Sequence, residues 1–589
     1  MDTHSFDPFY LDLHEGKLLR DGVDLRARPQ VVQVLRVFIE HPGVTVSIED
    51  LALWAWGEEQ LFENGKVIVT IHETRKLLGE YKNLIRTVPG GYRFEHPHLQ
   101  VKPERYQGQR LRRLLLTTFE DITREQAKAY LAEGITHELA TTLSRLGNLR
   151  LIKAQGRQDF QALADQGARE VEYLVEGSVG GTEQRANVHV RLIACADRTI
   201  VWSETYRVTD FQSIQQTIAA KIAEAINVNI NLEEVKNMQS DERVDSETYK
   251  LYLHGLYHWS RPTEVDLFRA LEYFRQVNLR KPYAKAFGAM AHTYGLLGLG
   301  GYLRPDRAMP QAKSAALKCL ELSPNSPEGL SGMAAVEAYY LWNWKRAEEL
   351  LKQAIALNPN YDTGHHLYAM GCLMPQGRLD EALRQISAAW ELNPLSPFIA
   401  TCVGIVHFYM RNYDRSIEQF DRALELQPHY HLAHWHRGWT LIELKRFHEA
   451  VSALEGAVEM SHDSPQVIAA LGQVYAAAEQ VRDARRVLRQ LKQIAAERYV
   501  SPYDVALIHI SLGDNAKALG LLKDAVDQRA PAVTRLRVHP LFDRFHSNPQ
   551  FLGLLRTMNL DTESPFKTKS ARKRQKKSVV SNPKWKRGQ

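Results

Sequence analysis

The chain of 589 residues is 44% hydrophobic and 24% charged, which is ordinary for a soluble globular protein. A single hydrophobic core rarely serves more than about 250–300 residues, so this length predicts several domains. The formal net charge of +6 is unevenly distributed, because residues 565–589 contain ten Lys and Arg residues and no acidic residue. The basic character of the chain therefore belongs to its tail.

The N-terminus and the cysteines exclude further classes. The opening MDTHSFDPFY has neither a basic start nor a long apolar core, so it predicts no secretory signal peptide. The cysteines are too far apart for a paired zinc-ligand motif; they are Cys195, Cys319, Cys372 and Cys402. The uncharged stretches 286–303 and 395–410 are interrupted by glycines or too short for a membrane span, which favours buried helices. We expect a cytoplasmic protein without membrane contact.

The first 98 residues begin with strands, continue with helices and end with a hairpin. Residues 5–28 alternate apolar and polar side chains between turns, which predicts a small antiparallel sheet. Helical spacing predicts helices over 29–41, from Ser47 onward and over 65–78. Residues 85–94 contain Pro-Gly-Gly at their centre and predict a closing hairpin.

This order of elements resembles the winged-helix DNA-binding domain of OmpR/PhoB-type regulators. RARPQVVQVLRVFIEHPGVTVSIEDLALWAWG is similar to the first two helices of that family, and RTVPGGYRF is similar to its wing. The resemblance covers about residues 5–96, and we assign the domain to residues 1–98. It implies binding to double-stranded DNA, with the third helix in the major groove.

The third helix carries the candidate DNA contacts. Helical spacing directs Val67, Ile71, Thr74 and Leu78 inward, which leaves a polar outer face. The resemblance assigns DNA binding to residues of this face and of the wing, namely Lys66, Thr70, His72, Arg75, Lys76, Arg86, Thr87 and Arg93. The alternative is that Arg75 and Lys76 merely form a solvated helix face.

Two departures from the family pattern support a second hypothesis. Glu73 stands where several family members carry a base-reading arginine, and Pro89 replaces a wing residue that is often basic. Residues 1–98 also contain 11 Lys and Arg against 15 Asp and Glu, whereas domains that bind phosphate are usually basic. The alternative function is an interaction scaffold whose winged helix no longer binds DNA.

A basic linker over residues 99–113 leads to a different unit over 114–232. Its pattern predicts strands at 114–119, 149–154, 173–179, 186–194 and 200–206, with helices at 127–146 and 160–167. The stretches YLAEGITHELATTLSRL, VEYLVEGSVGG and VRLIACADRTIVWSETY resemble the TolB-N-like domain of bacterial signalling proteins. The resemblance implies a central α/β domain.

Residues 240–560 repeat with the tetratricopeptide period. Prolines at 324, 359, 394 and 428 are expected to end successive helices, with spacings of 35, 35 and 34 residues. Small residues recur where paired helices must touch; they are Ala347, Ala382, Ser416, Ala450 and Ala484 at one site, and Ala354, Ala389, Ala423 and Ala457 at another. The repeats predict a helical solenoid that binds a protein partner or a second copy of the chain.

Together these features predict a multidomain protein with α+β and all-α parts: an N-terminal winged helix, a central α/β domain and a C-terminal tetratricopeptide solenoid. The plan resembles HilA-like transcription regulators, for which contact with RNA polymerase is a further expectation. We expect no enzymatic activity, cofactor or metal, because the sequence lacks a P-loop, GxSxG and HExxH. Residues 565–589 are predicted to be a disordered basic tail. This tail either adds non-specific affinity for DNA or serves only as a solvated, solubilising segment.

Overall fold

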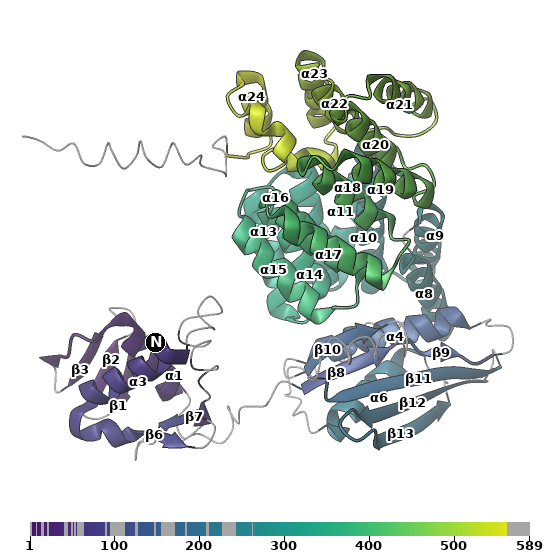
Figure 1. The fold of residues 1–589 in the computed structure, drawn as a ribbon. Helices are drawn as coiled ribbons and strands as arrows, with labels where there is room; N and C mark the ends of the chain where they lie inside the picture. The colour runs from purple at the N-terminus through teal and green to yellow at the C-terminus, as the bar shows by residue number, and fades with distance from the viewer. Residues whose placement is uncertain are drawn as a thin grey trace, which may run out of the picture. The chain divides into compact units, whose positions relative to one another are not determined.

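The structure is a computed structural model, and its described residues fall into two compact units, Met1–Arg110 and Leu111–Gln589 (Figure 1). The described residues are 3–6, 9–12, 17–20, 23–40, 45–46, 48, 51, 55, 64–88, 91–94, 112–123, 128–146, 149–154, 171–182, 185–207, 211–226, 243–261 and 263–561. The predicted basic tail, most of the predicted linker and the predicted helix over 160–167 lie outside them.

The first unit contains the predicted sheet, helices and hairpin. Its antiparallel sheet has the order β1 (Thr3–Phe6), β2 (Phe9–Asp12), β3 (Lys17–Arg20) and β4 (Val23–Asp24). Two helices follow, α1 (Pro29–Glu40) and α3 (Asn64–Leu78). The second sheet has the order β5 (Thr45–Val46), β7 (Gly91–Phe94) and β6 (Ile85–Val88). The second predicted helix lies mainly outside the described residues. The order of these elements is consistent with the predicted winged helix.

One core joins α1, α3 and the hairpin. Val34, Leu35 and Phe38 on α1 are buried, and the Phe38 ring stacks on Phe94 of β7 at 6.0 Å between centroids. The buried residues on α1 recur every three or four positions, as expected for an amphipathic helix. Buried residues of α3 belong to the same core, so the opposite face of α3 remains outside.

The second unit begins with a mixed sheet in the order β10, β8, β11, β12 and β13. Its strands are β8 (Arg112–Thr117), β9 (Glu120–Asp121), β10 (Leu149–Ala154), β11 (Tyr173–Thr182), β12 (Arg185–Ala194) and β13 (Ile200–Arg207). The strands β10, β8 and β11 pair in parallel, and β12 and β13 continue the sheet with antiparallel pairings. The predicted strands are confirmed, and α4 (Ala129–Ser144) matches the first predicted helix. The sequence interpretation missed α6 (Phe211–Ala225).

The predicted boundary between linker and sheet was wrong by two residues. Arg112 and Arg113 belong to β8, because both lie in its parallel register with β10. The Arg112 guanidinium donates to Glu172 at 2.7 Å. A residue held in this way is part of the folded sheet, not of a basic linker.

The remaining helices form the predicted array of repeats (Figure 1). The α-helices are α8 (Ser246–Trp259), α9 (Glu264–Arg280), α10 (Ala284–Leu299), α11 (Pro305–Leu322), α12 (Pro327–Val336), α13 (Trp344–Leu357), α14 (Asp362–Leu367), α15 (Leu379–Leu392), α16 (Pro397–Tyr409), α17 (Tyr413–Leu426), α18 (His431–Glu443), α19 (Phe447–Met460), α20 (Pro465–Ala477), α21 (Val481–Ile494), α22 (Pro502–Ser511), α23 (Asn515–Asp527) and α24 (Pro549–Thr557). Two π-helical segments, η3 (Glu337–Leu341) and η4 (Tyr368–Leu373), and two 3-10 segments, η5 (Pro531–Arg535) and η6 (Pro540–Phe545), complete it.

The sequence markers of the repeats have the predicted roles. The helices α11, α13, α15 and α17 each end two residues before one of the spaced prolines. All nine small residues expected at helix contacts have an exposed fraction of 0%. Larger side chains there would overfill a closely packed interior, so these positions set the distance between paired helices.

A further regularity appears in the turns within the helix pairs. Each turn contains one residue with left-handed backbone, and these residues are Trp342, Gly377, Arg411, Lys445, Glu479 and Gly513. Their spacing is 35 residues once and 34 thereafter. Glycine adopts this conformation without strain, so two of the six turns use the preferred residue.

The central sheet and the first repeat helices share one core. The hydroxyls of Tyr249 and Tyr252 on α8 donate to the buried Glu138 carboxylate of α4 at 3.2 and 3.0 Å. Lys285 of α10 donates to the same carboxylate at 2.7 Å. A buried carboxylate is costly unless charge and hydrogen bonds satisfy it, so this cluster ties the sheet to the repeats. The predicted boundary between 232 and 240 lies outside the described residues and stays a prediction.

Candidate nucleic-acid interface

The inner face of α3 agrees with the helical pattern of the sequence. Val67, Ile71, Thr74 and Leu78 have exposed fractions of at most 1%. The Thr74 hydroxyl donates to the Thr70 carbonyl oxygen at 2.7 Å, which satisfies a polar group inside the core. The opposite face of α3 is therefore the one available to a partner.

Thr70 does not belong to that outer face. Its exposed fraction is 5%, so the prediction that it lies on the outside is wrong. Thr70 precedes Thr74 by one helical turn and therefore shares the buried stripe. The burial of Thr70 argues against a direct contact between its side chain and a base edge.

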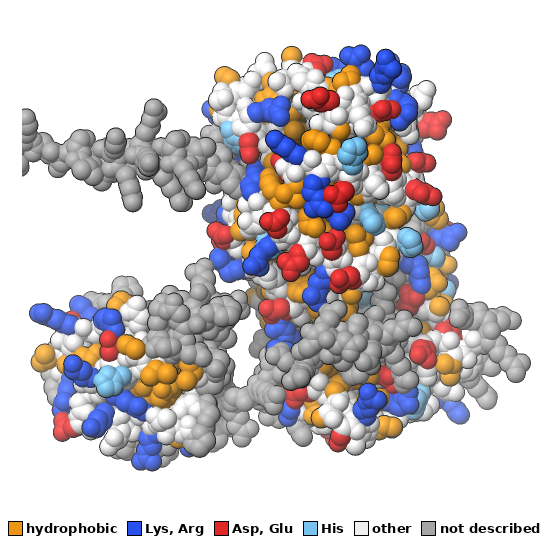
Figure 2. Space-filling view, viewed as in Figure 1, with side chains coloured by type: hydrophobic (Ala, Val, Ile, Leu, Met, Phe, Trp, Pro, Cys, Tyr) orange, Lys and Arg blue, Asp and Glu red, His pale blue; other side chains and the backbone are white. Residues whose placement is uncertain are grey.

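Two apolar residues that the sequence interpretation missed lie on the outer face. Ile68 and Val69 have exposed fractions of 50% and 55%. His72 and Lys76 follow at helical spacing and are also exposed. Figure 2 shows hydrophobic side chains gathered beside a histidine and basic side chains on the visible face of this unit. Two adjacent exposed β-branched residues beside exposed cations make this face a candidate contact surface.

Arg75 joins α3 to the wing. Its guanidinium donates to the Ile85 carbonyl oxygen at 3.0 Å from Nε and 2.7 Å from one terminal nitrogen, and to Thr87 Oγ1 at 2.9 Å. It also lies over the Tyr92 ring, 5.5 Å from the centroid. These contacts show that Arg75 is more than a solvated charge. The hydrogen bonds to Ile85 and Thr87 occupy N–H donors of the Arg75 guanidinium that a contact with a base edge would need.

Glu73 is paired within the domain. The guanidinium of Arg28 donates to its carboxylate and holds the pKa of Glu73 below its ordinary value. Arg28 precedes α1, so the pair connects the start of that helix with the outer part of α3. The pairing neutralises the acidic residue that argued against DNA binding. Arg28 was not among the residues expected near this surface.

The wing residues lie on adjacent strands. Arg86 and Arg93 face each other in the register of β6 and β7, as do Thr87 and Tyr92. Arg86 and Thr87 are exposed, and Arg93 is half-buried. Lys66 lies within α3, but its side chain is outside the described residues. The structure thus groups His72, Lys76 and the apolar pair on α3, and separately connects Arg75 with the wing.

The part of the chain that the structure describes offers no grouping of three or more His, Cys, Asp or Glu suited to a metal. Within the same residues, no helix has both the length and the apolar character that crossing a membrane would need.

Family comparisons agree with the two parts of the chain. Residues 22–94 match the family described as transcriptional regulatory protein, C terminal. Residues 404–465 and 441–501 match tetratricopeptide-repeat families. The regulator match covers α1, α3 and the hairpin, and the repeat matches extend from α16 to the residue before α22.

Several curated proteins are similar to this chain. Transcriptional regulator HilA of Salmonella typhimurium is 24% identical over 424 residues, which cover 70% of this chain and 74% of HilA. Transcriptional regulatory protein CutR of Streptomyces coelicolor is 38% identical over 84 residues, which cover 14% of this chain and 38% of CutR. Putative adenylate cyclase 3 of Rhizobium meliloti is 23% identical over 243 residues, which cover 40% of each chain.

Proposed function

We propose that this chain, a HilA-like regulator with an OmpR/PhoB-type domain and tetratricopeptide repeats, binds specific sequences of double-stranded DNA through α3. The observation that carries the proposal is the exposed face of α3, where Ile68 and Val69 lie beside His72 and Lys76. In the major groove, thymine presents a methyl group that apolar side chains contact, while cations reach phosphates and guanine. The face therefore suits thymine-containing DNA.

The wing would add contacts from its strands. Arg86, Thr87 and Arg93 lie on β6 and β7, and Arg75 holds this hairpin against α3. We assign phosphate or groove contacts to Arg86 and Arg93, as the winged-helix arrangement implies. Lys66, near the start of α3, would reach the backbone of the same site.

The repeats would bind a protein partner or a second copy of the chain. Stacked repeats bury a continuous core and leave an extended surface for association. We place the regulator in the cytoplasm. RNA polymerase is one protein partner that the repeats would contact. The central sheet, which resembles a TolB-N-like domain, would link the regulator domain to the repeats.

A second function is favoured by the same apolar pair. Exposed Ile68 and Val69 in a domain with more acidic than basic residues would also suit a protein interface, as in a scaffold that no longer binds DNA. The two functions differ in one measurable property. Only the DNA-binding regulator recovers a common sequence from random duplexes.

The full chain should therefore be used to select duplexes from a random pool. Enrichment of one motif supports the regulator, and a pool that stays random after repeated rounds supports the scaffold. Replacing thymines in the motif by deoxyuridine removes only the methyl groups, and each buried methyl is worth about 0.8 kcal/mol, or about fourfold in Kd. This replacement should weaken the parent protein and leave a Val69→Ser variant less affected at the thymine that Val69 contacts.

A further inference from the structure

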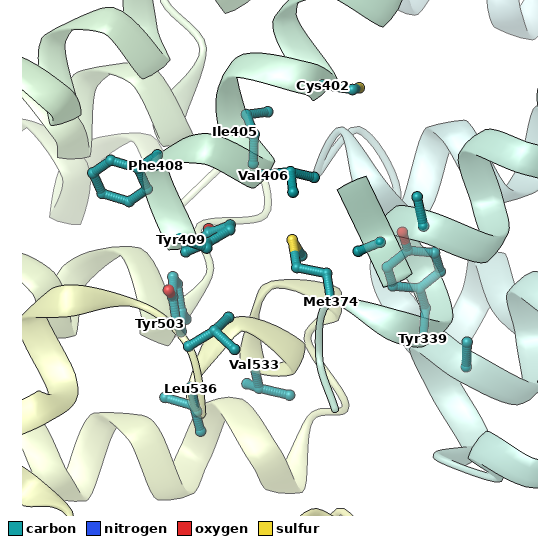
Figure 3. Packing of buried hydrophobic residues seen from close by; sticks show 14 of the residues in the cluster. Tyr339, Met374, Cys402, Ile405, Val406, Phe408, Tyr409, Tyr503, Val533 and Leu536 are labelled. Carbon is teal, nitrogen blue, oxygen red and sulfur yellow. The ribbon is translucent and has the colours of Figure 1, made fainter. Parts of the chain in front are cut away.

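A small cavity lies inside the repeat array. It has a volume of about 70 Å³ and is bordered by Leu299, Tyr339, Met370, Met374, Ile405, Trp435, Gln466, Asp504, Pro531, Ala532, Thr534 and Arg535. Figure 3 shows Tyr339, Met374 and Ile405 around this part of the interior. One water molecule requires roughly 10–15 Å³ on this scale, so the space admits about five to seven heavy atoms.

The cavity contains an acid and a base that do not pair with each other. Asp504 on α22 is 3% exposed, and its Oδ2 atom has no hydrogen-bond donor among the described residues. Arg535, at the end of η5, is half-buried, and its guanidinium lies 5.9 Å from the centroid of the Trp439 ring. Opposite charges in one apolar space normally pair, because isolation of each is costly.

Trp435 adds an unused donor. Its Nε1 atom is buried at the cavity without an acceptor among the described residues. A buried N–H group without a partner costs about 1–3 kcal/mol, and native structures contain few of them. The side chains of Gln466 and Thr534, which also border the cavity, donate to the carbonyl oxygens of Leu299 and Pro531. The groups left for a ligand therefore include the acceptor Asp504 and the donors Arg535 and Trp435.

The backbone around the cavity is irregular. Tyr339 belongs to the π-helical segment η3, Met370 belongs to η4, and Met374 follows η4 directly. Single π-helical turns interrupt α-helices mainly at functional sites, because the extra residue redirects neighbouring side chains. Two such turns in neighbouring repeats both contribute to this lining.

We propose that the cavity binds a small α-amino acid as its zwitterion. The ammonium group would donate to Asp504, and the carboxylate would accept from Arg535 and Trp435. The lining has no net charge when Asp504 is ionised, which matches a ligand with one charge of each sign. Met370, Met374 and Ile405 would surround the side chain, and flexible methionines adapt to small differences in shape.

The pKa of Asp504 is consistent with an unsatisfied carboxylate. Burial raises this pKa to about 7, and the charge of Arg535 opposes the increase. Asp504 in turn helps to raise the pKa of the neighbouring Tyr499 and Tyr503 hydroxyls, whose pKa is raised mainly by burial, so both stay neutral near pH 7. An ammonium ligand would supply the donor that the carboxylate lacks.

The full chain should be titrated with glycine, L-alanine, L-serine and L-valine by calorimetry at pH 7.5. We expect heat of binding from at least one of the three smallest compounds. Propionate lacks the ammonium group, alaninamide lacks the carboxylate, and both are no larger than alanine. Each should bind the parent at least tenfold more weakly than alanine.

Asp504→Asn removes the charge without a change of shape and should weaken the amino acid by tenfold or more. Asp527→Asn removes an exposed carboxylate of α23; it is the matched control and should bind as the parent does. No binding of any of the four compounds up to 10 mM, or equal affinity for propionate and alanine, would overturn the proposal. The compounds that lack the ammonium group or the carboxylate are measured on the parent protein. They therefore test the proposal even where the Asp504 variant fails to fold.

Discussion

The outer face of α3 and the helix contacts of the repeats follow the same helical period, but they differ in what covers them. Among the repeats, the small residues at helix contacts are fully buried by neighbouring helices of the same chain. On α3, Ile68 and Val69 stay about half exposed. The repeat positions can be identified from sequence because the chain itself fills them. The exposed positions on α3 are filled by no other part of the described chain, so packing does not explain why they are apolar.

The strongest way to test the repeat side of this comparison is to empty one contact. Phe420 on α17 is completely buried, and a Cβ atom added at Gly404 of α16 would lie 2.5 Å from its ring. Phe420→Ala should lower stability by about 3–5 kcal/mol, because it leaves a cavity between two helices. Thermal unfolding of the full chain measures the loss.

Phe398→Ala is the matched control for Phe420→Ala. Phe398 lies on α16 with an exposed fraction of 38%, so its removal should cost much less. An equal loss of stability in the two variants would contradict the finding that Phe420 is buried in this repeat and Phe398 is partly exposed.

A second prediction concerns Asp504, the buried carboxylate of the proposed ligand site. Its pKa of about 7 in the folded state is above the ordinary value of 3.8. Between these two pH values the folded state binds more protons than the unfolded state, so the free energy of unfolding falls as pH rises and levels off above about pH 7. The amide introduced by Asp504→Asn stays neutral, so the stability gained by this substitution should grow by about 2 kcal/mol between pH 5.5 and pH 8. Thermal unfolding without amino acids at both pH values measures this gain.

The exposed Asp527→Asn variant provides the control for this pH dependence. It should show a difference from the parent that is independent of pH. A gain for Asp504→Asn that is larger at pH 5.5 than at pH 8 would show that burial does not raise the pKa of Asp504.

The sequence predicted those parts of the fold in which local pattern and packing agree. The spaced prolines, the buried small residues and the strands of the central sheet all have the expected places. The pattern misplaced Thr70, because a threonine is equally compatible with a buried or an exposed helix position when its hydroxyl can bond within the helix. It also considered Arg75 only as a DNA contact or a solvated charge, since a contact with the Ile85 carbonyl oxygen depends on tertiary structure.

Arg75 and Lys76 therefore provide a sharper test of α3. Lys76→Ala should weaken binding to the selected DNA by about 1–3 kcal/mol and leave thermal stability nearly unchanged, since its side chain is exposed. Arg75→Ala should weaken binding and also destabilise the domain by about 1–3 kcal/mol, because the Ile85 carbonyl oxygen and Thr87 lose a charged donor.

Electrophoretic shift and thermal unfolding on the same preparations measure both quantities. Lys523→Ala, an exposed lysine of α23, serves as the control for loss of one positive charge. An Arg75→Ala variant with the stability of the parent would contradict the structural role of this residue.

The smallest expected effects come from the repeated turns, which the sequence pattern did not reveal. Glu479 is exposed and has a φ of 61°, whereas Gly513 occupies the corresponding turn of the next repeat with a φ of 83°. Glu479→Gly relieves about 1 kcal/mol or more of left-handed strain but increases the entropy of the unfolded chain, so the net gain should be about 0.5 kcal/mol.

Gly513→Ala should cost about 1 kcal/mol, because an added Cβ meets no atom within 4 Å and only the backbone opposes it. Gly520→Ala, within α23 and equally open, should instead stabilise by about 0.5–1 kcal/mol. Thermal unfolding of the three variants should therefore give opposite signs for the two alanine substitutions; the same sign for both would show that the turn conformation does not limit repeat stability.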